Sequence, residues 1–138
     1  MTAYIHPTAL VNPGFVPSPF TIVDEGVAIF EDVTVGSFVH IHAGAKLRKG
    51  CVVGDHVTIC DGADLGENVV VQDFAVVGKQ PPAETPDAEC MPSSVVRTGV
   101  WIGNHTVIYA GLTLGEGCEI GDGAIVREDV PAGAIVRP

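Results

Sequence analysis

The chain has 138 residues, a length that fits one domain, and apolar residues make up 46% of it against 17% charged residues. That balance excludes a disordered tail, and the net charge of -10 argues against nucleic acid and anionic membranes as main partners, because both repel an acidic surface. No apolar stretch is long enough to span a membrane and the start lacks the features of a signal peptide, so we expect a cytoplasmic protein.

A six-residue period runs through the chain from its beginning. Aliphatic residues recur at the first place of each six-residue line over residues 5–77, with Pro17 as the exception, and the frame resumes over residues 96–126. The fourth place is usually a residue that tolerates the positive φ of a tight corner: Gly14, Gly26, Asp32, Gly44, Gly50, Gly62, Asn68, Gly99, Gly111, Gly117, Gly123 and Asp129. The period predicts a β-helix of stacked repeats, an all-β fold that forms a single domain over residues 1–138.

Other fourth places carry rings. If three lines make one turn, residues 18 apart lie one above the other at a spacing of about 4.8 Å. At this interval the corner holds Phe20, Phe38, His56 and Phe74. His105 continues the series if the 31 residues that separate it from Phe74 include a thirteen-residue insertion. We therefore predict one column of stacked rings, and an inserted loop in the aperiodic, proline-rich segment of about residues 79–95.

Polar residues occupy the second place of successive turns. Asp24, His42 and Cys60 follow one another at the 18-residue interval, and Gly78 ends the series without a side chain. His40 lies two residues before His42 and faces the same way, because side chains alternate along a strand. We expect one polar patch, in which Asp24 either orients the His42 imidazole for catalysis or forms an ordinary cross-strand polar ladder.

Two segments carry a resemblance to a known family. The segment VRTGVWIGNHTVIYAGLTLGEGCEIGDGAIVREDVPAGAIV, from Val96 onward, resembles the closing coils of hexapeptide-repeat acyltransferases. The segment GSFVHIHAGAKLRKGCVVGDHV resembles the members that acetylate amino groups on nucleotide-linked sugars. The resemblance implies a left-handed parallel β-helix, a homotrimer with active sites between subunits, and acetyl-CoA as acyl donor. It also implies that Ala110 and Gly111 leave room for the pantetheine arm and that Arg127 faces the coenzyme A phosphates.

Acyl transfer to an amine needs a base, and histidine is suited to this role because its pKa is near neutral. The acetyltransferases of the maltose and galactoside type carry a catalytic histidine in their inserted loop, and the loop of this chain has none. We rank His105 first, because it follows the loop and interrupts a run of glycine corners, and His56 and His42 as alternatives. For His105 and His56 the structural alternative is a stacking ring.

These observations favour an acetyl-CoA-dependent acyltransferase whose acceptor is a small molecule, an amino sugar on a nucleotide carrier. A trimeric binding or scaffold module without catalysis is the second hypothesis. The third is zinc-dependent hydration, because His40, His42 and Cys60 are zinc-ligand types and some left-handed β-helices are carbonic anhydrases. Those enzymes carry two histidines five residues apart, a pattern that is absent after Ile59, so we expect no metal.

Overall fold

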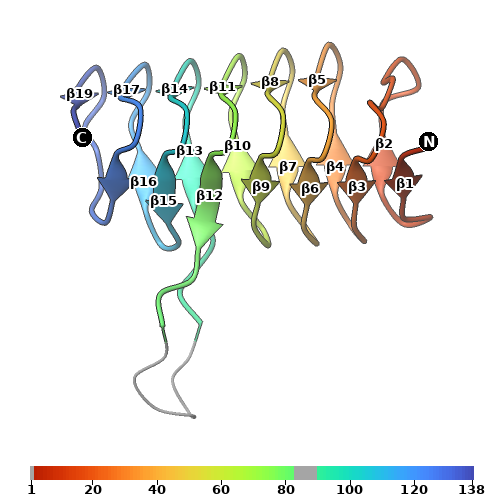
Figure 1. Ribbon diagram of the computed structural model, residues 1–138, viewed down its shortest axis with the longest axis horizontal. Helices are drawn as coiled ribbons and strands as arrows, with labels where there is room; N and C mark the ends of the chain where they lie inside the picture. Colours follow the sequence, from red (N-terminus) through yellow and green to blue (C-terminus); the bar gives the residue numbers. More distant parts are fainter. Residues whose placement is uncertain (1, 83–89) are drawn as a thin grey trace.

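The computed structural model describes residues 2–82 and 90–138, which form one parallel β-helix (Figure 1). Met1 and residues 83–89, which belong to the predicted loop, lie outside the described residues. The described ranges contain nineteen short strands and no helix, so they also contain no helix that could cross a membrane. The prediction of an all-β helix of hexapeptide repeats is confirmed.

The strands form three parallel sheets, one on each face of the helix. Sheet A contains β1 (Tyr4–Ile5), β3 (Ile22–Val23), β6 (His40–Ile41), β9 (Thr58–Ile59), β12 (Val76–Lys79), β15 (Val107–Tyr109) and β18 (Ile125–Val126). Sheet B contains β2 (Leu10–Val11), β4 (Ala28–Ile29), β7 (Lys46–Leu47), β10 (Asp64–Leu65), β13 (Val95–Val96) and β16 (Thr113–Leu114). Sheet C contains β5 (Thr34–Val35), β8 (Val52–Val53), β11 (Val70–Val71), β14 (Trp101–Ile102), β17 (Glu119–Ile120) and β19 (Ile135–Val136).

The register of the sheets confirms the predicted turn of 18 residues. Ile41 pairs with Ile59, for example, and Leu65 pairs with Val96 across the interruption, an interval of 31 residues that contains the thirteen-residue insertion. The line that begins at Pro17 forms no strand, because proline has no N–H to donate to a neighbour.

The core consists of stacked aliphatic residues from the first and fifth places of each line. Ile41, Leu65 and Ile102 have no exposed surface, and Cys118 takes a fifth place in the same core. The side chain of the buried Thr106 donates its hydroxyl to the carbonyl oxygen of Gly121 at 3.2 Å, so its polar atom has a partner. Because each turn covers the next, the repeat buries a continuous interior without a second domain.

The corners carry the predicted positive φ angles with two exceptions. Gly14 does not adopt one, and there the N–H of Gly14 donates to Oδ1 of Asn12 at 3.0 Å. Asp129 does not adopt one either, because the last turn is two residues shorter: Ile120 pairs with Val136, 16 residues on. The ring column is confirmed, with centroid separations of 4.7, 4.8, 4.7 and 4.9 Å along Phe20, Phe38, His56, Phe74 and His105.

Candidate functional site

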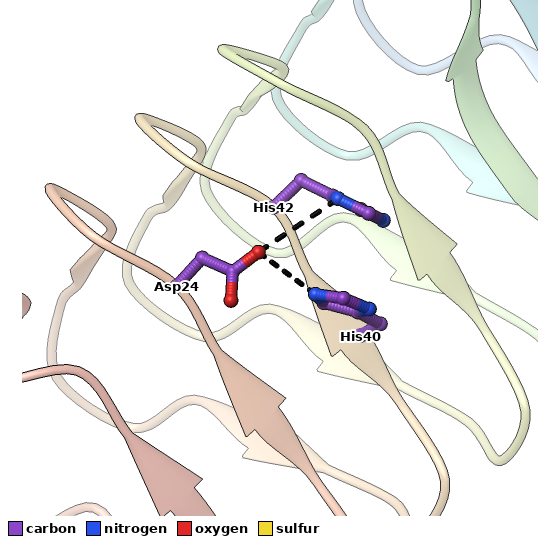
Figure 2. Close-up of side chains that lie close together, drawn as sticks. All are labelled: Asp24, His40 and His42. Atoms are coloured by element: carbon purple, nitrogen blue, oxygen red, sulfur yellow. Dashed lines mark hydrogen bonds and ion pairs between the residues drawn. The ribbon is translucent and has the colours of Figure 1, made fainter.

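The predicted polar patch forms on sheet A, where Asp24 follows β3 and the two histidines lie in and after β6. Figure 2 shows Asp24 reaching from one turn to both imidazoles of the next. Oδ2 of Asp24 lies 2.8 Å from Nε2 of His40 and 3.8 Å from Nδ1 of His42. The two rings stack with their centroids 3.8 Å apart. The close contact with His40 therefore holds the carboxylate in place beside His42.

His42 also lines a hollow of about 390 Å³ between sheet A and the base of the loop. The lining residues are His42, Cys60, Asp61, Gly78, Gln80, Cys90, Met91 and Ser93. The side chain of His42 is 33% exposed, so the imidazole is half-buried but reachable from the hollow. The hollow thus has one imidazole, two thiols and one carboxylate on its walls, groups that can take up or release protons.

The two ends of the loop are joined above this hollow by side chains. The Gln80 amide donates to the carbonyl oxygen of Met91 at 3.0 Å and accepts the N–H of Met91 at 2.8 Å. The Ser93 hydroxyl donates to the carbonyl oxygen of Asp61 at 3.2 Å, which fixes the returning strand to the turn below. These bonds set the height of the roof over His42.

Gly78 marks the point where the loop leaves the regular helix. Its φ of 95° is in the region that favours glycine, and the pairing of β12 with β15 shifts there, so that Lys79 rather than Gly78 lies opposite Tyr109. A Cβ at Gly78 would lie 3.2 Å from Cβ of Cys60. The absence of a side chain therefore keeps the space beside the Cys60 thiol open.

The other two candidate bases lie elsewhere, at the corner between sheets C and A. The His56 ring stacks between Phe38 and Phe74, and His105 stacks on Phe74 at the end of the column. Gly123 follows His105 in the next turn, and no heavy atom lies within 4 Å of a Cβ built there. Neither histidine lines the hollow. The structure thus separates His105 and His56 from His42.

The three residues expected to contact the donor lie on the C-terminal turns. Ala110 is buried, and Gly111 has a φ of 81° with Cε of Met91 only 2.9 Å from the position of a Cβ. Arg127 is exposed, lies 5.2 Å from the centroid of the Tyr109 ring and lines a second hollow of about 360 Å³. It follows β18 as His42 follows β6, so both side chains leave the same face of sheet A.

The polar patch has the ligand types of a metal site. One ligand atom from each of Asp24, His40 and His42 lies within 4.8 Å of the others, and across residues 2–82 and 90–138 this is the group of that kind. Cys60, which the sequence offered as a zinc ligand, is not part of it. A metal bound here would have two imidazoles and one carboxylate, a set that zinc accepts.

Sequence reasoning missed two residues of the hollow. Asp61 places Oδ1 3.7 Å from Nδ1 of His42, and Gln80 joins the ends of the loop. Asp61 is the outward neighbour of Cys60 in its line, so the repeat frame contained a signal for it. Gln80 lies in the aperiodic segment, where no spacing predicts a partner.

Comparisons with known proteins agree on the fold. No protein-family model matches the chain. Residues of the chain are 32% identical over 78 positions to an acyl-[acyl-carrier-protein]--UDP-N-acetylglucosamine O-acyltransferase of Brucella ovis, and equally to that of Brucella canis. The match covers 56% of this chain and 24% of each relative, so the chain spans about a quarter of the length of the curated relatives it matches.

Three solved structures superpose over nearly the whole chain. The acetyltransferase domain of PglB from Neisseria gonorrhoeae has a TM-score of 0.61 at 22% identity, covering 97% of this chain and 53% of that one. A hexapeptide transferase family protein from Anaplasma phagocytophilum scores 0.58 at 16% identity, covering 96% and 72%. AntD, an N-acyltransferase from Bacillus cereus in complex with dTDP and coenzyme A, scores 0.52 at 17%, covering 96% and 75%. The chain therefore has the left-handed parallel β-helix fold of the hexapeptide-repeat acyltransferases.

Proposed function

We propose that the chain is an acetyl-CoA-dependent acyltransferase that acetylates the amino group of a sugar on a nucleotide carrier. The observation that carries the proposal is an imidazole, His42, placed beside a fixed carboxylate on the wall of a hollow under the loop. The similarity to acyltransferases and acetyltransferases supports the class of reaction. AntD, with dTDP and coenzyme A bound, supports a nucleotide-linked acceptor and a coenzyme A donor.

His42 is the base in this proposal, in place of His105. Nδ1 of His42 faces Oδ2 of Asp24 at 3.8 Å and Oδ1 of Asp61 at 3.7 Å, and no hydrogen bond reaches its Nε2 from the described residues. Nε2 can then take the proton of the acceptor amine, while the two carboxylates stabilise the imidazolium that forms. His105 has no comparable carboxylate contact within residues 2–82 and 90–138, and its ring is engaged with Phe74.

The donor would lie along sheet A from Arg127 toward the hollow. Cys60, Gly78, Tyr109 and Arg127 occupy consecutive turns, so Arg127 and Cys60 are separated by three strand spacings, roughly 14 Å. An extended pantetheine arm covers such a distance, with its phosphate end at Arg127 and its thioester beside Gly78. Gly111 provides a surface without a side chain along the way.

A homotrimer in the cytoplasm completes the proposal. Apolar side chains such as Phe30 and Val52 point outward from the faces of the helix and are 43% and 44% exposed, surface that neighbouring subunits would cover. The four cysteines, Cys51, Cys60, Cys90 and Cys118, are free, which agrees with a reducing compartment. Light scattering of the purified protein measures the number of subunits directly.

The first experiment is a calorimetric titration with acetyl-CoA, with the zinc content of the same sample measured. Micromolar binding to the metal-free protein, followed by acetyl transfer to a nucleotide-linked amino sugar, is the expected result. Binding of coenzyme A without transfer to any amine would favour a scaffold module. Stoichiometric zinc with no binding of acetyl-CoA would contradict the acyltransferase and favour hydration chemistry at Asp24, His40 and His42.

A further inference from the structure

One row of sheet A places three catalytic residue types in consecutive turns. Asp24 follows β3, His42 follows β6 and Cys60 follows β9, and the three strands pair in register, with Val23 opposite Ile41 and Ile41 opposite Ile59. Each side chain is therefore about one strand spacing, roughly 4.8 Å, from the next. Carboxylate, imidazole and thiol in this order are the parts of a covalent acyl-transfer site, in which the base activates the nucleophile and the acid orients the base.

The imidazole is oriented toward this use. Nδ1 of His42 faces the carboxylates of Asp24 and Asp61, which leaves Nε2 as the nitrogen that can take a proton from a neighbouring group. His42 and Cys60 both line the hollow under the loop, so the space that admits a substrate reaches both.

The next position in the row gives the thiol a free side. Gly78 is buried, and a Cβ there would lie 3.2 Å from Cβ of Cys60 and 3.6 Å from Oγ of Ser94. Any other residue would fill the place beside the sulfur, where a thioester carbonyl must come to be attacked. The bulge at Gly78 also directs the chain into the loop that covers the hollow.

We propose that Cys60 is a nucleophile that carries the acyl group between donor and acceptor, with His42 as its base. The proposal rests on the acyltransferase function proposed above. The thiol proton passes to Nε2 of His42 while Sγ bonds to the thioester carbonyl carbon. The bond to the coenzyme A sulfur then breaks, and the departing thiolate takes the proton from His42. In the second half the acceptor amine attacks the acyl-cysteine, His42 takes the amine proton, and the Cys60 thiolate leaves and recovers it.

The environment of the thiol explains why it needs the imidazole. Burial raises the pKa of the Cys60 thiol above its ordinary value, the Asp61 carboxylate raises it further and Lys79 lowers it. The group is therefore a thiol rather than a thiolate at neutral pH, and it becomes a nucleophile only as its proton moves to His42. Cys51 and Cys118 are buried in the core, away from any substrate.

The test is the exchange of labelled coenzyme A into acetyl-CoA in the absence of an acceptor. A covalent intermediate allows this exchange, so the wild-type protein is expected to catalyse it and Cys60→Ala to lose it by at least about a hundredfold. Cys118→Ala is the matched control, because alanine already occupies fifth places of the core such as Ala45 and Ala63, and it should exchange at the wild-type rate. In the wild-type protein, peptide mass mapping should place the acetyl group on Cys60, a result that does not depend on how the variant folds.

Direct transfer would give a different pattern. If wild-type protein acetylates an acceptor but catalyses no exchange, or if Cys60→Ala acetylates it at the wild-type rate, the covalent step is overturned while the acyltransferase function stands. If the wild-type protein neither binds acetyl-CoA nor transfers its acetyl group, both proposals are overturned.

Alkylation by iodoacetamide tests the pairing of the two side chains without an acyl donor. Cys60 should react several-fold more slowly in His42→Asn than in wild type, while the exposed Cys90 provides the internal reference. Equal labelling of Cys60 in both proteins would overturn the role of His42 as its base.

Discussion

Two columns of side chains run along this β-helix, and each contains histidine. At the corner between sheets C and A, the ring column repeats one kind of group, so that each ring packs on the next at 4.7–4.9 Å. On sheet A, the row Asp24, His42, Cys60 changes chemical type at every turn. A column of like rings can stabilise itself by stacking, whereas a row of unlike groups offers proton transfer between neighbours.

The difference shows that histidine alone does not indicate a catalytic position in a repeat protein. His56 and His105 each have a ring as their neighbour in the column, and the hollow is out of their reach. His42 has carboxylates on one side and the hollow on the other. The neighbours one turn away decide which histidine can do chemistry.

The largest expected effect follows from exchanging the two columns' histidines one at a time. His42→Ala should lower turnover by roughly two to four orders of magnitude, because it removes the general base, while acetyl-CoA still binds. His105→Ala should change turnover by less than about threefold, since it removes one stacking ring at the end of a column. Steady-state rates with one amino-sugar acceptor, together with calorimetric binding of acetyl-CoA, measure both.

The reverse outcome would restore the ranking made from the sequence. A His105→Ala protein that folds and binds acetyl-CoA but turns over a hundredfold more slowly would place the base at the corner, with His42 in a structural ladder. Circular dichroism of each variant separates loss of folding from loss of chemistry.

Stability should respond in the ring column rather than in the polar row. Phe74 stacks on His56 and on His105, and its φ is 62°, a left-handed conformation that is unfavourable for a bulky residue. Phe74→Ala removes both stacking contacts and keeps the strain, so it should lower the free energy of unfolding by about 1–3 kcal/mol. Phe74→Gly should recover about 1 kcal/mol of that loss, because glycine tolerates this φ.

Denaturant titration of the two variants at one protein concentration measures the difference, since the concentration matters if subunits associate. Equal stability of Phe74→Ala and Phe74→Gly would mean that the corner is not strained. A loss of turnover in either variant would contradict the separation of the two columns.

The repeat made most of the fold predictable from the sequence. Because one period fixes which residues face inward, turn inward at corners and stack, the spacing predicted the ring column and the insertion between Phe74 and His105. It also predicted that Asp24 lies beside His42. It failed at Gly14 and Asp129, where an Asx turn and a shortened last turn replace the regular corner.

The hollow was beyond reach of the spacing because the loop that covers it has no period. The contact of Gln80 with Met91 joins residues 11 apart within an aperiodic segment, and the shift at Gly78 moves Tyr109 opposite Lys79 rather than opposite Gly78. The candidate base was ranked by its distance from the loop in sequence. In space the corner that carries His105 is not the corner from which the loop emerges.

The smallest expected effect concerns the cover that the polar row has and the ring column lacks. Gln80→Ala removes two hydrogen bonds to Met91, each of which contributes about 0.5–1.5 kcal/mol net, so the loop should open more often. The acceptor KM should rise about fivefold, as expected for a loss near 1 kcal/mol, with kcat within about twofold because His42 and Asp24 keep their places. Gln72→Ala is the matched control, because Gln72 lies on sheet C and its side chain has no hydrogen bond within the described part of the chain. An unchanged KM in Gln80→Ala would mean that the acceptor does not bind beneath the loop, whereas a loss of kcat alone would make Gln80 part of the chemistry rather than of the cover.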